Sequence, residues 1–435
     1  MFIIGLSVRD KKLSFVLNSE IIELSSFYFS FEIEMVKNEN IKIVVGLTNS
    51  ADSKVAAYLL NRQGYEVIGV TFFYMPSKKK LAADNNKSEG YEQLDFKCRV
   101  EDSKDIKSFC QKIGIQHLGY SADEEFKDEV IDICVAHRIK SASGNPCFGC
   151  SKLTLKLLYL KAKELGVDFI STGHYAKVHL SQTTKSYFLN AANDINSDQS
   201  FLLANISQEI LSSLILPLGD LRKIEVNKIA QRQGWGANKK PLEKKCLSGS
   251  TFIEYVEKNV AKSLLSSGNV MKLNDDLSIG SHEGLHLQYF GEKFDGSIYP
   301  TTSPGEYVVV DVNRKKGAVY VEDKVLISCK RIFLNNLRIK KSAVKTKPKK
   351  VIVKIEENPI TYPAIIHFKN NNSCLIILEK KVNKIFPSGT YVTIYEELFG
   401  GRLSILGSGR VRYESKFLEI QNGDKNDKKI SDFEL

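Results

Sequence analysis

The stretch IKIVVGLTNSADSKVAAYLLNRQGYEVIGVTFF, residues 41–73, decides the fold of this chain. An apolar run over 41–47 predicts a buried strand, and apolar residues then recur at helical spacing: Val55, Ala56, Leu59 and Leu60. Gly64 ends this helix, and a second apolar run follows directly over 65–73. Strand, helix and strand in this order predict a βαβ unit of a parallel sheet. The helix would begin at the carboxyl end of the first strand, where free N–H groups and the helix dipole favour a phosphate.

Composition indicates a globular protein of several domains. The chain has 435 residues, of which 43% are hydrophobic and 26% charged, and this length favours two or three cores. The net charge of +11 favours a polyanionic partner and leaves nucleic acid as an open alternative. Eight cysteines without an export signal indicate a reducing compartment, so we expect a cytoplasmic protein. Because no apolar run approaches the roughly 20 residues that span a bilayer, we expect no membrane partner.

Changes in composition and in the predicted secondary-structure pattern divide the chain into five parts. Strand and helix patterns alternate in the largest part, which predicts an open parallel α/β sheet interrupted by a polar excursion from Pro76 to Lys97. One of the predicted helices is longer than the others and runs from Glu124 to Lys140. Short strands rich in Val, Ile and Tyr then predict two β modules. The predicted boundaries are 1–36 for an N-terminal extension of unknown role, 37–262 for the α/β domain, 263–330 and 331–415 for the β modules, and 416–435 for a polar tail.

A run of cations opens the second β module. Nine Lys or Arg residues and no acidic residue lie between Arg331 and Lys354. The run fits a solvated face of a β-barrel, and it also fits a surface that binds a nucleic-acid backbone.

Two cysteine motifs are candidates for chemistry. Cys147 and Cys150 lie in Asn145-Pro146-Cys147-Phe148-Gly149-Cys150, directly before a predicted helix, and a thiol at a helix N-terminus has a lowered pKa. A nucleophile, a metal ligand and an incidental pair all remain open for this motif. Cys246 follows two lysines, which would stabilise a thiolate.

Two further motifs lie where elements begin or end. Thr172-Gly173-His174-Tyr175-Ala176 follows a predicted strand, so His174 is either a phosphate or substrate contact or a structural histidine. Asp198-Gln199-Ser200-Phe201 opens a predicted helix, for which Asp198 would serve as N-cap.

Taken together, the motifs over about residues 41–412 resemble the bacterial tRNA-specific 2-thiouridylases (MnmA/TrmU family) of the PP-loop ATP pyrophosphatase superfamily. The resemblance rests on the loop at 48–53 and on the motifs above. Further motifs in the same order are Pro217-Leu218-Gly219, Ile279-Gly280, His282-x-Gly284-Leu285-His286, Pro387-x-Gly389 and Gly407-x-Gly409.

The resemblance implies a PP-loop α/β sheet, a small central β domain and a C-terminal β-barrel. It implies ATP-dependent adenylation of C2 of the wobble uridine in tRNA, with Mg²⁺, and then sulfur transfer from a persulfide that a donor protein supplies. Cys246 would carry the persulfide, and Cys150 would form a disulfide with it. The implied ATP-binding residues are Gly46, Leu47, Thr48, Asn49, Ser50, Asp52, Ser53, Phe72, Gly173 and His174. The implied tRNA-binding residues are Asp198, Gln199, Ser200, Lys340, Lys341 and Lys347.

The loop departs from the family pattern Ser-Gly-Gly-Val-Asp-Ser. Asn49 and Ser50 replace both glycines, so we expect strain of ~1–3 kcal/mol per misfit residue and weakened ATP binding. One alternative is therefore an impaired paralogue that binds tRNA or carries sulfur without ATP. Another is an iron–sulfur enzyme in which Cys147, Cys150 and Cys246 ligate a cluster with one open iron.

Overall fold

The computed structural model describes residues 41–74, 94, 104–140, 142, 145–182, 184–236, 247, 250–262, 265–273, 277–294, 296–300, 302, 305–324, 327–339, 347–356, 360–398, 400–412 and 419–420. Several predicted features lie outside these residues: the N-terminal extension, the excursion from Pro76 to Lys97 apart from Leu94, Lys340, Lys341, Cys246 and most of the polar tail.

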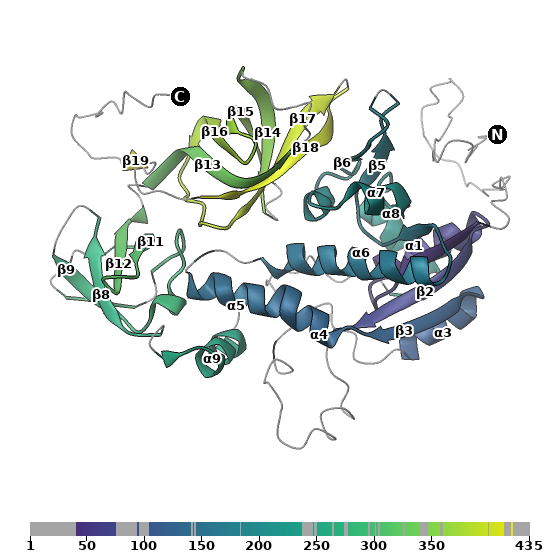
Figure 1. Ribbon diagram of the computed structural model, residues 1–435, viewed down its shortest axis with the longest axis horizontal. Coiled ribbons are helices and arrows are strands. Elements are labelled where there is room, and N and C mark those ends of the chain that lie inside the picture. Colours follow the sequence, from purple (N-terminus) through teal and green to yellow (C-terminus); the bar gives the residue numbers. More distant parts are fainter. Residues whose placement is uncertain are drawn as a thin grey trace.

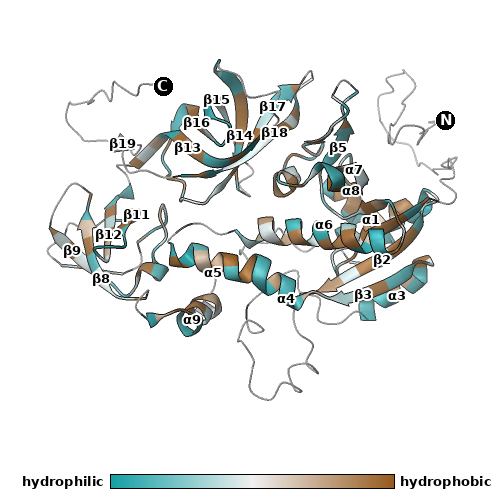
Figure 2. Cartoon of the chain, in the orientation of Figure 1, coloured by the Kyte–Doolittle hydropathy of each residue, from teal (hydrophilic) through white to brown (hydrophobic). Residues whose placement is uncertain are grey.

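The first domain is the predicted parallel α/β sheet, with strand order β3-β2-β1-β4-β7 and every neighbouring pair parallel. Its strands are β1 (Lys42–Gly46), β2 (Glu66–Phe73), β3 (Gln116–Ser121), β4 (Phe169–Ser171) and β7 (Leu214–Ile215). Successive side chains of β1 point to opposite faces of the sheet. Val44 packs with Leu155 and Leu158 of α6 (Pro146–Glu164). Ile43 and Val45 pack with the core-facing sides of α1 (Ala51–Arg62) and α3 (Lys104–Ile113). Figure 2 shows this core as predominantly brown strands between helices with teal outer faces.

The βαβ unit forms as the sequence predicts. Ser50 caps α1, and the helix ends just before Gly64, whose φ of 86° closes the turn into β2. Local patterning therefore suffices for this part of the fold.

Two helix predictions need correction. The predicted helix over 124–140 is three segments: α4 (Asp123–Phe126), a π-helix (Lys127–Ile131) and α5 (Asp132–Ile139). Asp198 does not cap an α-helix, because only a 3₁₀-helix (Ser200–Leu203) follows it and Gln199 is its N-cap. Hydrophobic periodicity reports burial of a face and does not distinguish these helix types.

The remaining elements before the C-terminal module belong to the first domain and to a central sheet. The first domain also contains α7 (Gln208–Ser213), α8 (Lys223–Arg232), α9 (Ser250–Asn259) and the hairpin of β5 (Lys177–Leu180) and β6 (Tyr187–Asn190). The central sheet has the order β10-β9-β8-β12-β11. Its strands are β8 (Gly268–Lys272), β9 (Ser278–His282), β10 (Ser297–Ile298), β11 (Tyr307–Asn313) and β12 (Ala318–Asp323).

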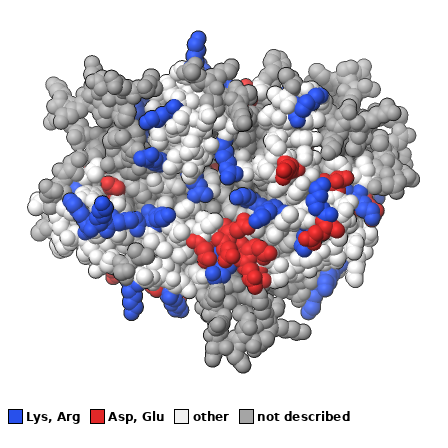
Figure 3. Space-filling view, in the orientation of Figure 1, with Lys and Arg blue, Asp and Glu red and all other residues white. Residues whose placement is uncertain are grey.

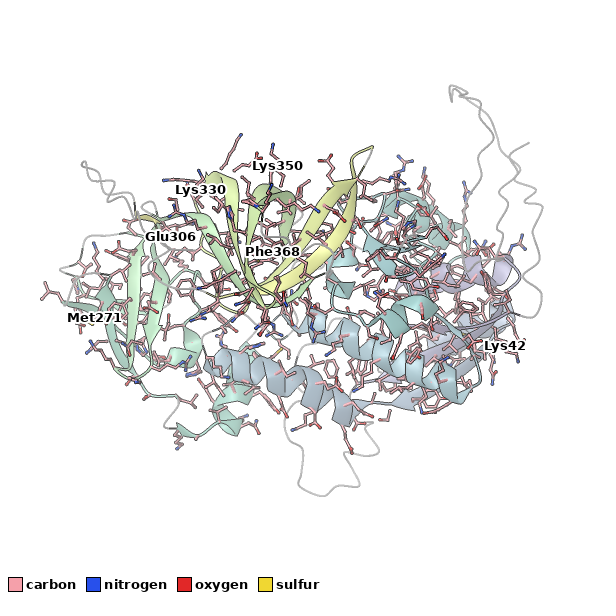
Figure 4. All side chains as sticks on the ribbon, turned by 45° about the horizontal axis from the view of Figure 1, so that its top comes forward. Lys42, Met271, Glu306, Lys330, Lys350 and Phe368 are labelled. Carbon is pink, nitrogen blue, oxygen red and sulfur yellow. The ribbon has the colours of Figure 1, made fainter. Side chains whose placement is uncertain are left out.

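The C-terminal module is a closed antiparallel β-barrel. Its strands follow the order β13-β16-β15-β14-β17-β18, and pairing of β13 with β18 closes it. They are β13 (Ile327–Ile339), β14 (Lys349–Ile355), β15 (Thr361–Asn370), β16 (Ser373–Val382), β17 (Tyr391–Leu398) and β18 (Arg402–Val411); β19 (Glu419–Ile420) pairs with β13. Figure 1 shows the parallel and central sheets at opposite ends of the molecule, with the barrel above α5 and α6. Figure 4 labels Lys42 on the parallel sheet, far from Met271 of the central sheet.

A buried ion pair joins the barrel to the α/β domain. Lys354 of β14 donates from Nζ to Oδ2 and to the backbone oxygen of Asp198, each at 3.2 Å, and the two side chains are 4% and 0% exposed. The Lys354 ammonium also lies 4.5 Å from the ring centre of Phe201. Asp198 accepts further bonds from the backbone N–H of Ala192 and from the N–H and Oγ of Ser200. Each charge is therefore compensated by direct contacts.

Among the helices of the described residues, none is long and apolar enough to span a membrane.

The buried pair gives a stability prediction. Lys354→Ala leaves the Asp198 carboxylate buried without its ammonium, so we expect a loss of ~3–5 kcal/mol. Lys42→Ala is the control, because Lys42 pairs with Glu66 at 3.0 Å with both side chains about half exposed, and it should leave the unfolding midpoint nearly unchanged. Urea denaturation followed by circular dichroism measures both. Equal midpoints for the two variants would contradict the assigned role of Lys354.

Candidate nucleotide site and thiol cluster

Backbone hydrogen bonds fix the loop at the carboxyl end of β1. Leu47 is buried; its N–H donates to the Val70 oxygen at 2.7 Å, and its own oxygen accepts from Thr71 Oγ1 at 3.1 Å. Gly46 is buried as well, and Phe72 packs in the core on the α6 side of the sheet. These three predicted site residues support the loop from within the core.

The hydroxyl groups of the loop bond to one another. Ser53 Oγ donates to the Thr48 oxygen at 2.9 Å, and Thr48 N–H donates to Ser53 Oγ at 3.1 Å. Ser50 Oγ accepts from the Ser53 N–H at 3.2 Å as the N-cap of α1, whereas Asn49 is exposed. The loop is therefore ordered by its own side chains.

The strain expected from the missing glycines does not arise in this conformation. Ser50 has φ −70° and ψ 146°, which is the extended conformation that an N-cap residue normally adopts. Asn49 is not among the described residues with positive φ. The prediction of strained backbone at these two positions is therefore wrong, because a capped helix start needs no left-handed residue.

Asp52 is held by two side chains that the sequence analysis missed. Lys223 Nζ lies 2.6 Å from each carboxylate oxygen, and Tyr175 donates its hydroxyl to Oδ1 at 2.8 Å. Tyr175 is 2% exposed, and burial beside the Asp52 carboxylate raises the pKa of its hydroxyl well above the usual range. Tyr175 stands in the quoted motif after β4, but Lys223 is 171 positions from Asp52 and carries no local signal.

The backbone of Lys223 is fixed at the start of α8. Its N–H donates to Asp194 Oδ2 at 2.9 Å, and Glu225 completes a capping box with Arg222. Burial raises the pKa of Asp194, but hydrogen bonds from Lys223 and Ser197 outweigh it and lower that pKa overall.

Gly173 and His174 lie against the first turn of α1. A Cβ on Gly173 would stand 2.7 Å from the Ser53 nitrogen, so only glycine fits there without movement. His174 shares hydrogen bonds with Thr172 Oγ1 at 2.7 Å and Ser151 Oγ at 3.5 Å. Burial lowers the pKa of His174 to about 4, with Asp52 opposing the shift, so the ring is neutral at pH 7.

These residues fit a phosphate group better than they fit a metal ion. A helix N-terminus, three hydroxyls and the Lys223 ammonium converge at the end of β1, which is the chemistry that binds phosphate. For Mg²⁺ the loop offers the Asp52 carboxylate, both oxygens of which contact Lys223. Within the described residues, no group of three His, Cys, Asp or Glu side chains could hold a metal. The alternative iron–sulfur cluster would need the Cys246 thiolate, and Cys246 lies outside the described residues.

Cys150 lies in the second turn of α6, beside an apolar cluster. Its backbone oxygen accepts from Thr154 Oγ1 at 2.8 Å, and Thr154 Oγ1 lies 2.6 Å from the Tyr74 hydroxyl. The cluster against which Cys150 packs includes Cys134 and Leu247, the residue that follows Cys246. Leu247 is 7% exposed with a φ of 55°. Segments distant in the sequence thus meet beside the Cys150 turn.

The remaining predicted residues lie elsewhere. Asp198 and Ser200 are 4% and 0% exposed, and they form hydrogen bonds inside the interface with the barrel. Neither side chain therefore has a solvent-facing surface for the tRNA contact that the resemblance implies. Gln199 instead binds the backbone of Tyr175 through Oε1 at 3.1 Å and its own N–H at 2.8 Å. Lys347 is exposed before β14.

Two cations of the basic run are paired with carboxylates from other parts of the chain. Lys354 is buried against Asp198, and Lys349 pairs with Glu396 at 2.7 Å. Lys350, labelled on the barrel in Figure 4, is exposed. Two of the nine cations are therefore neutralised by carboxylates that lie far away in the sequence, and Lys354 belongs to no solvated face.

A cleft of about 670 Å³ separates α5 and the start of α6 from the barrel. Its lining includes Lys152, Arg338 and Arg410, and no carboxylate of the described residues lies at ion-pair distance from these three. Glu129, which also lines the cleft, pairs with Lys156 at 2.6 Å. Phe148, between the two cysteines of α6, stacks on Tyr391 of the barrel with ring centres 3.9 Å apart. The cleft is cationic, and it reaches the turn that carries the thiols.

The parallel sheet and the phosphate-type loop define an α/β nucleotide-binding domain of the HUP class, and a family model described as the tRNA methyl transferase HUP domain matches residues 41–247. Similarity to curated proteins extends over most of the chain. The tRNA-specific 2-thiouridylase MnmA of Clostridioides difficile is 28% identical over 360 residues, 82% of this chain and 95% of that protein. The MnmA of Staphylococcus aureus is 32% identical over 295 residues, 66% of this chain and 73% of that protein. The chain belongs to the family of tRNA-specific 2-thiouridylases.

A solved structure described as a 4-thiouridine synthetase–RNA complex with bound ATP is 15% identical, covers 51% of each chain and has a TM-score of 0.28. A likeness this low carries no argument about this chain.

Gly173→Ala tests the fit between the β4 loop and α1. The added Cβ forces the backbone of Asp52 and Ser53 to move, so we expect a loss of ~1–3 kcal/mol and weaker ATP binding. Gly149→Ala is the control for stability, because its Cβ would lie 3.4 Å or more from its neighbours. Thermal unfolding and calorimetry with ATP measure the two effects, and unchanged values for Gly173→Ala would contradict the close approach.

Proposed function

We propose that this protein is a tRNA-uridine 2-sulfurtransferase that uses ATP and a cysteine persulfide. The observation that carries the proposal is the convergence of the Cys150 turn and Leu247, the neighbour of Cys246, on one apolar cluster. Because the chain belongs to the 2-thiouridylase family, we interpret this convergence as the site of sulfur transfer. A cytoplasmic location and a protein that donates persulfide sulfur are parts of the same proposal.

In the proposed first step, ATP activates the uridine. The C2 oxygen of the base attacks the α-phosphorus, the bond to the β-phosphate breaks, and pyrophosphate leaves with the electron pair. Thr48, Ser50 and Ser53 would bind phosphate oxygens at the start of α1, and Mg²⁺ would arrive with the nucleotide. His174 would be neutral and would add no charge to the site, since burial lowers its pKa to about 4.

In the proposed second step, sulfur replaces the activated oxygen. The terminal sulfur of a Cys246 persulfide attacks C2, and AMP leaves with the oxygen. The Cys150 thiolate then attacks the inner sulfur, so that the sulfur–sulfur bond breaks toward the product and a Cys150–Cys246 disulfide forms. An external reductant restores the two thiols.

The cationic cleft supports tRNA binding next to Cys150. Figure 3 shows Lys and Arg side chains between the barrel and the region of α5 and α6, and a concentration of Asp and Glu below, around α4. A phosphate backbone that follows the cations would pass the start of α6 and avoid the acidic patch. This cleft replaces Asp198 and Ser200 as the proposed RNA contact.

The deciding experiment measures AMP release from ATP with unmodified tRNA. We expect release that depends on tRNA and Mg²⁺ and is lost in Asp52→Ala. Cys150→Ser and Cys246→Ser should retain tRNA binding and AMP release but form no 2-thiouridine, as measured by mass spectrometry of digested tRNA. Absence of AMP release with intact tRNA binding would favour a paralogue that binds tRNA or carries sulfur without ATP.

The cleft gives a separate prediction. Lys152→Gln combined with Arg338→Gln should weaken tRNA binding and reduce the slope of log K against log salt by ~0.7–0.9 per lost phosphate contact. The matched control combines Lys42→Gln with Lys163→Gln, two paired lysines at the amino end of the parallel sheet. An unchanged slope in the cleft variant, in a protein that binds tRNA, would exclude these cations as contacts.

A further inference from the structure

The contact between Lys223 and Asp52 brings a lysine ammonium to the 48–53 loop. The ammonium lies 2.6 Å from both carboxylate oxygens of Asp52, and carboxylate oxygens are the ligands that Mg²⁺ prefers. Lys223 also lies 5.0 Å from the ring centre of Tyr175, whose hydroxyl holds Oδ1. Side chains from α1, the β4 loop and α8 therefore meet at this charge pair.

We propose that Lys223 is a pyrophosphate-binding residue, which leaves Asp52 when the nucleotide binds and neutralises the pyrophosphate that departs from ATP. The proposal rests on the ATP-dependent function proposed above. As the bond between the α-phosphorus and the β-phosphate oxygen breaks, its electron pair adds negative charge to the leaving group. A lysine ammonium at that position stabilises the developing charge.

The geometry allows this movement. The backbone of Lys223 is fixed by Asp194 and by the capping box of α8, so the anchor of the side chain does not shift. The side chain itself is 31% exposed and has a flexible four-carbon stem, which can carry the ammonium from a carboxylate to a nearby phosphate.

The exchange also explains how Asp52 can serve Mg²⁺. While Lys223 contacts both oxygens, a metal ion at Asp52 would face an ammonium at close range. A triphosphate offers Lys223 a more concentrated negative charge than one carboxylate does. Without the ammonium at close range, the Asp52 carboxylate would be able to bind a Mg²⁺ ion that accompanies the nucleotide.

The test measures binding of inorganic pyrophosphate and of AMP separately, by calorimetry on the full chain. In Lys223→Met we expect pyrophosphate affinity to fall at least tenfold while AMP affinity changes less than twofold. Lys223→Arg should restore most of the pyrophosphate affinity. Lys177→Met is the matched control, because Lys177 pairs with Asp220 at 3.3 Å on β5 and should bind pyrophosphate as the native protein does.

A second variant separates this role from a structural one. Asp52→Asn releases Lys223, so without Mg²⁺ it should bind pyrophosphate more tightly than the native protein, whereas a loop that merely needs the ion pair would bind it less tightly. Native-like pyrophosphate binding by Lys223→Met, or weaker binding by Asp52→Asn, would overturn the proposal. A native protein that binds neither pyrophosphate nor AMP would instead contradict the ATP-dependent function itself.

Discussion

The buried pair of Lys354 and Asp198 is the constraint on which the site architecture depends. It fixes the barrel against the α/β domain, and the cationic cleft exists only in that arrangement. A buried ion pair contributes little net stability against an apolar substitute, but removal of one partner costs much more. The pair therefore specifies one docking geometry for the two domains more than it adds to stability.

Adjacent residues connect this anchor to the phosphate loop. Asp198 binds the barrel, Gln199 binds the backbone of Tyr175, and the Tyr175 hydroxyl binds Asp52. Phe148 of the cysteine motif also contacts the barrel, where it stacks on Tyr391. The barrel, the cysteine motif and the 48–53 loop are thus linked by a continuous series of direct contacts.

Structural features that depend on local sequence pattern can be predicted from the sequence, whereas contacts between residues far apart in the chain cannot. The run from Ile41 to Phe73 specified the βαβ unit, because apolar spacing and Gly64 define it within a few turns of chain. Lys354 was misassigned as a solvent-facing cation, since nothing near it in the sequence reveals Asp198. Strain at Ser50 was inferred from the family loop, but an N-cap conformation removes it. The π-helix after α4 has no signal in hydrophobic periodicity.

The closed barrel determines which sequence changes its connections can tolerate. Each strand from β13 to β18 is hydrogen-bonded to two neighbours, so none of these described strands presents an open backbone edge to another protein. The connections between the strands can therefore lengthen or alter their charge without exposing a template for aggregation. In evolutionary terms, the surface of the barrel can change its connections and its charge while the strands, and the α/β domain beside them, keep their structure.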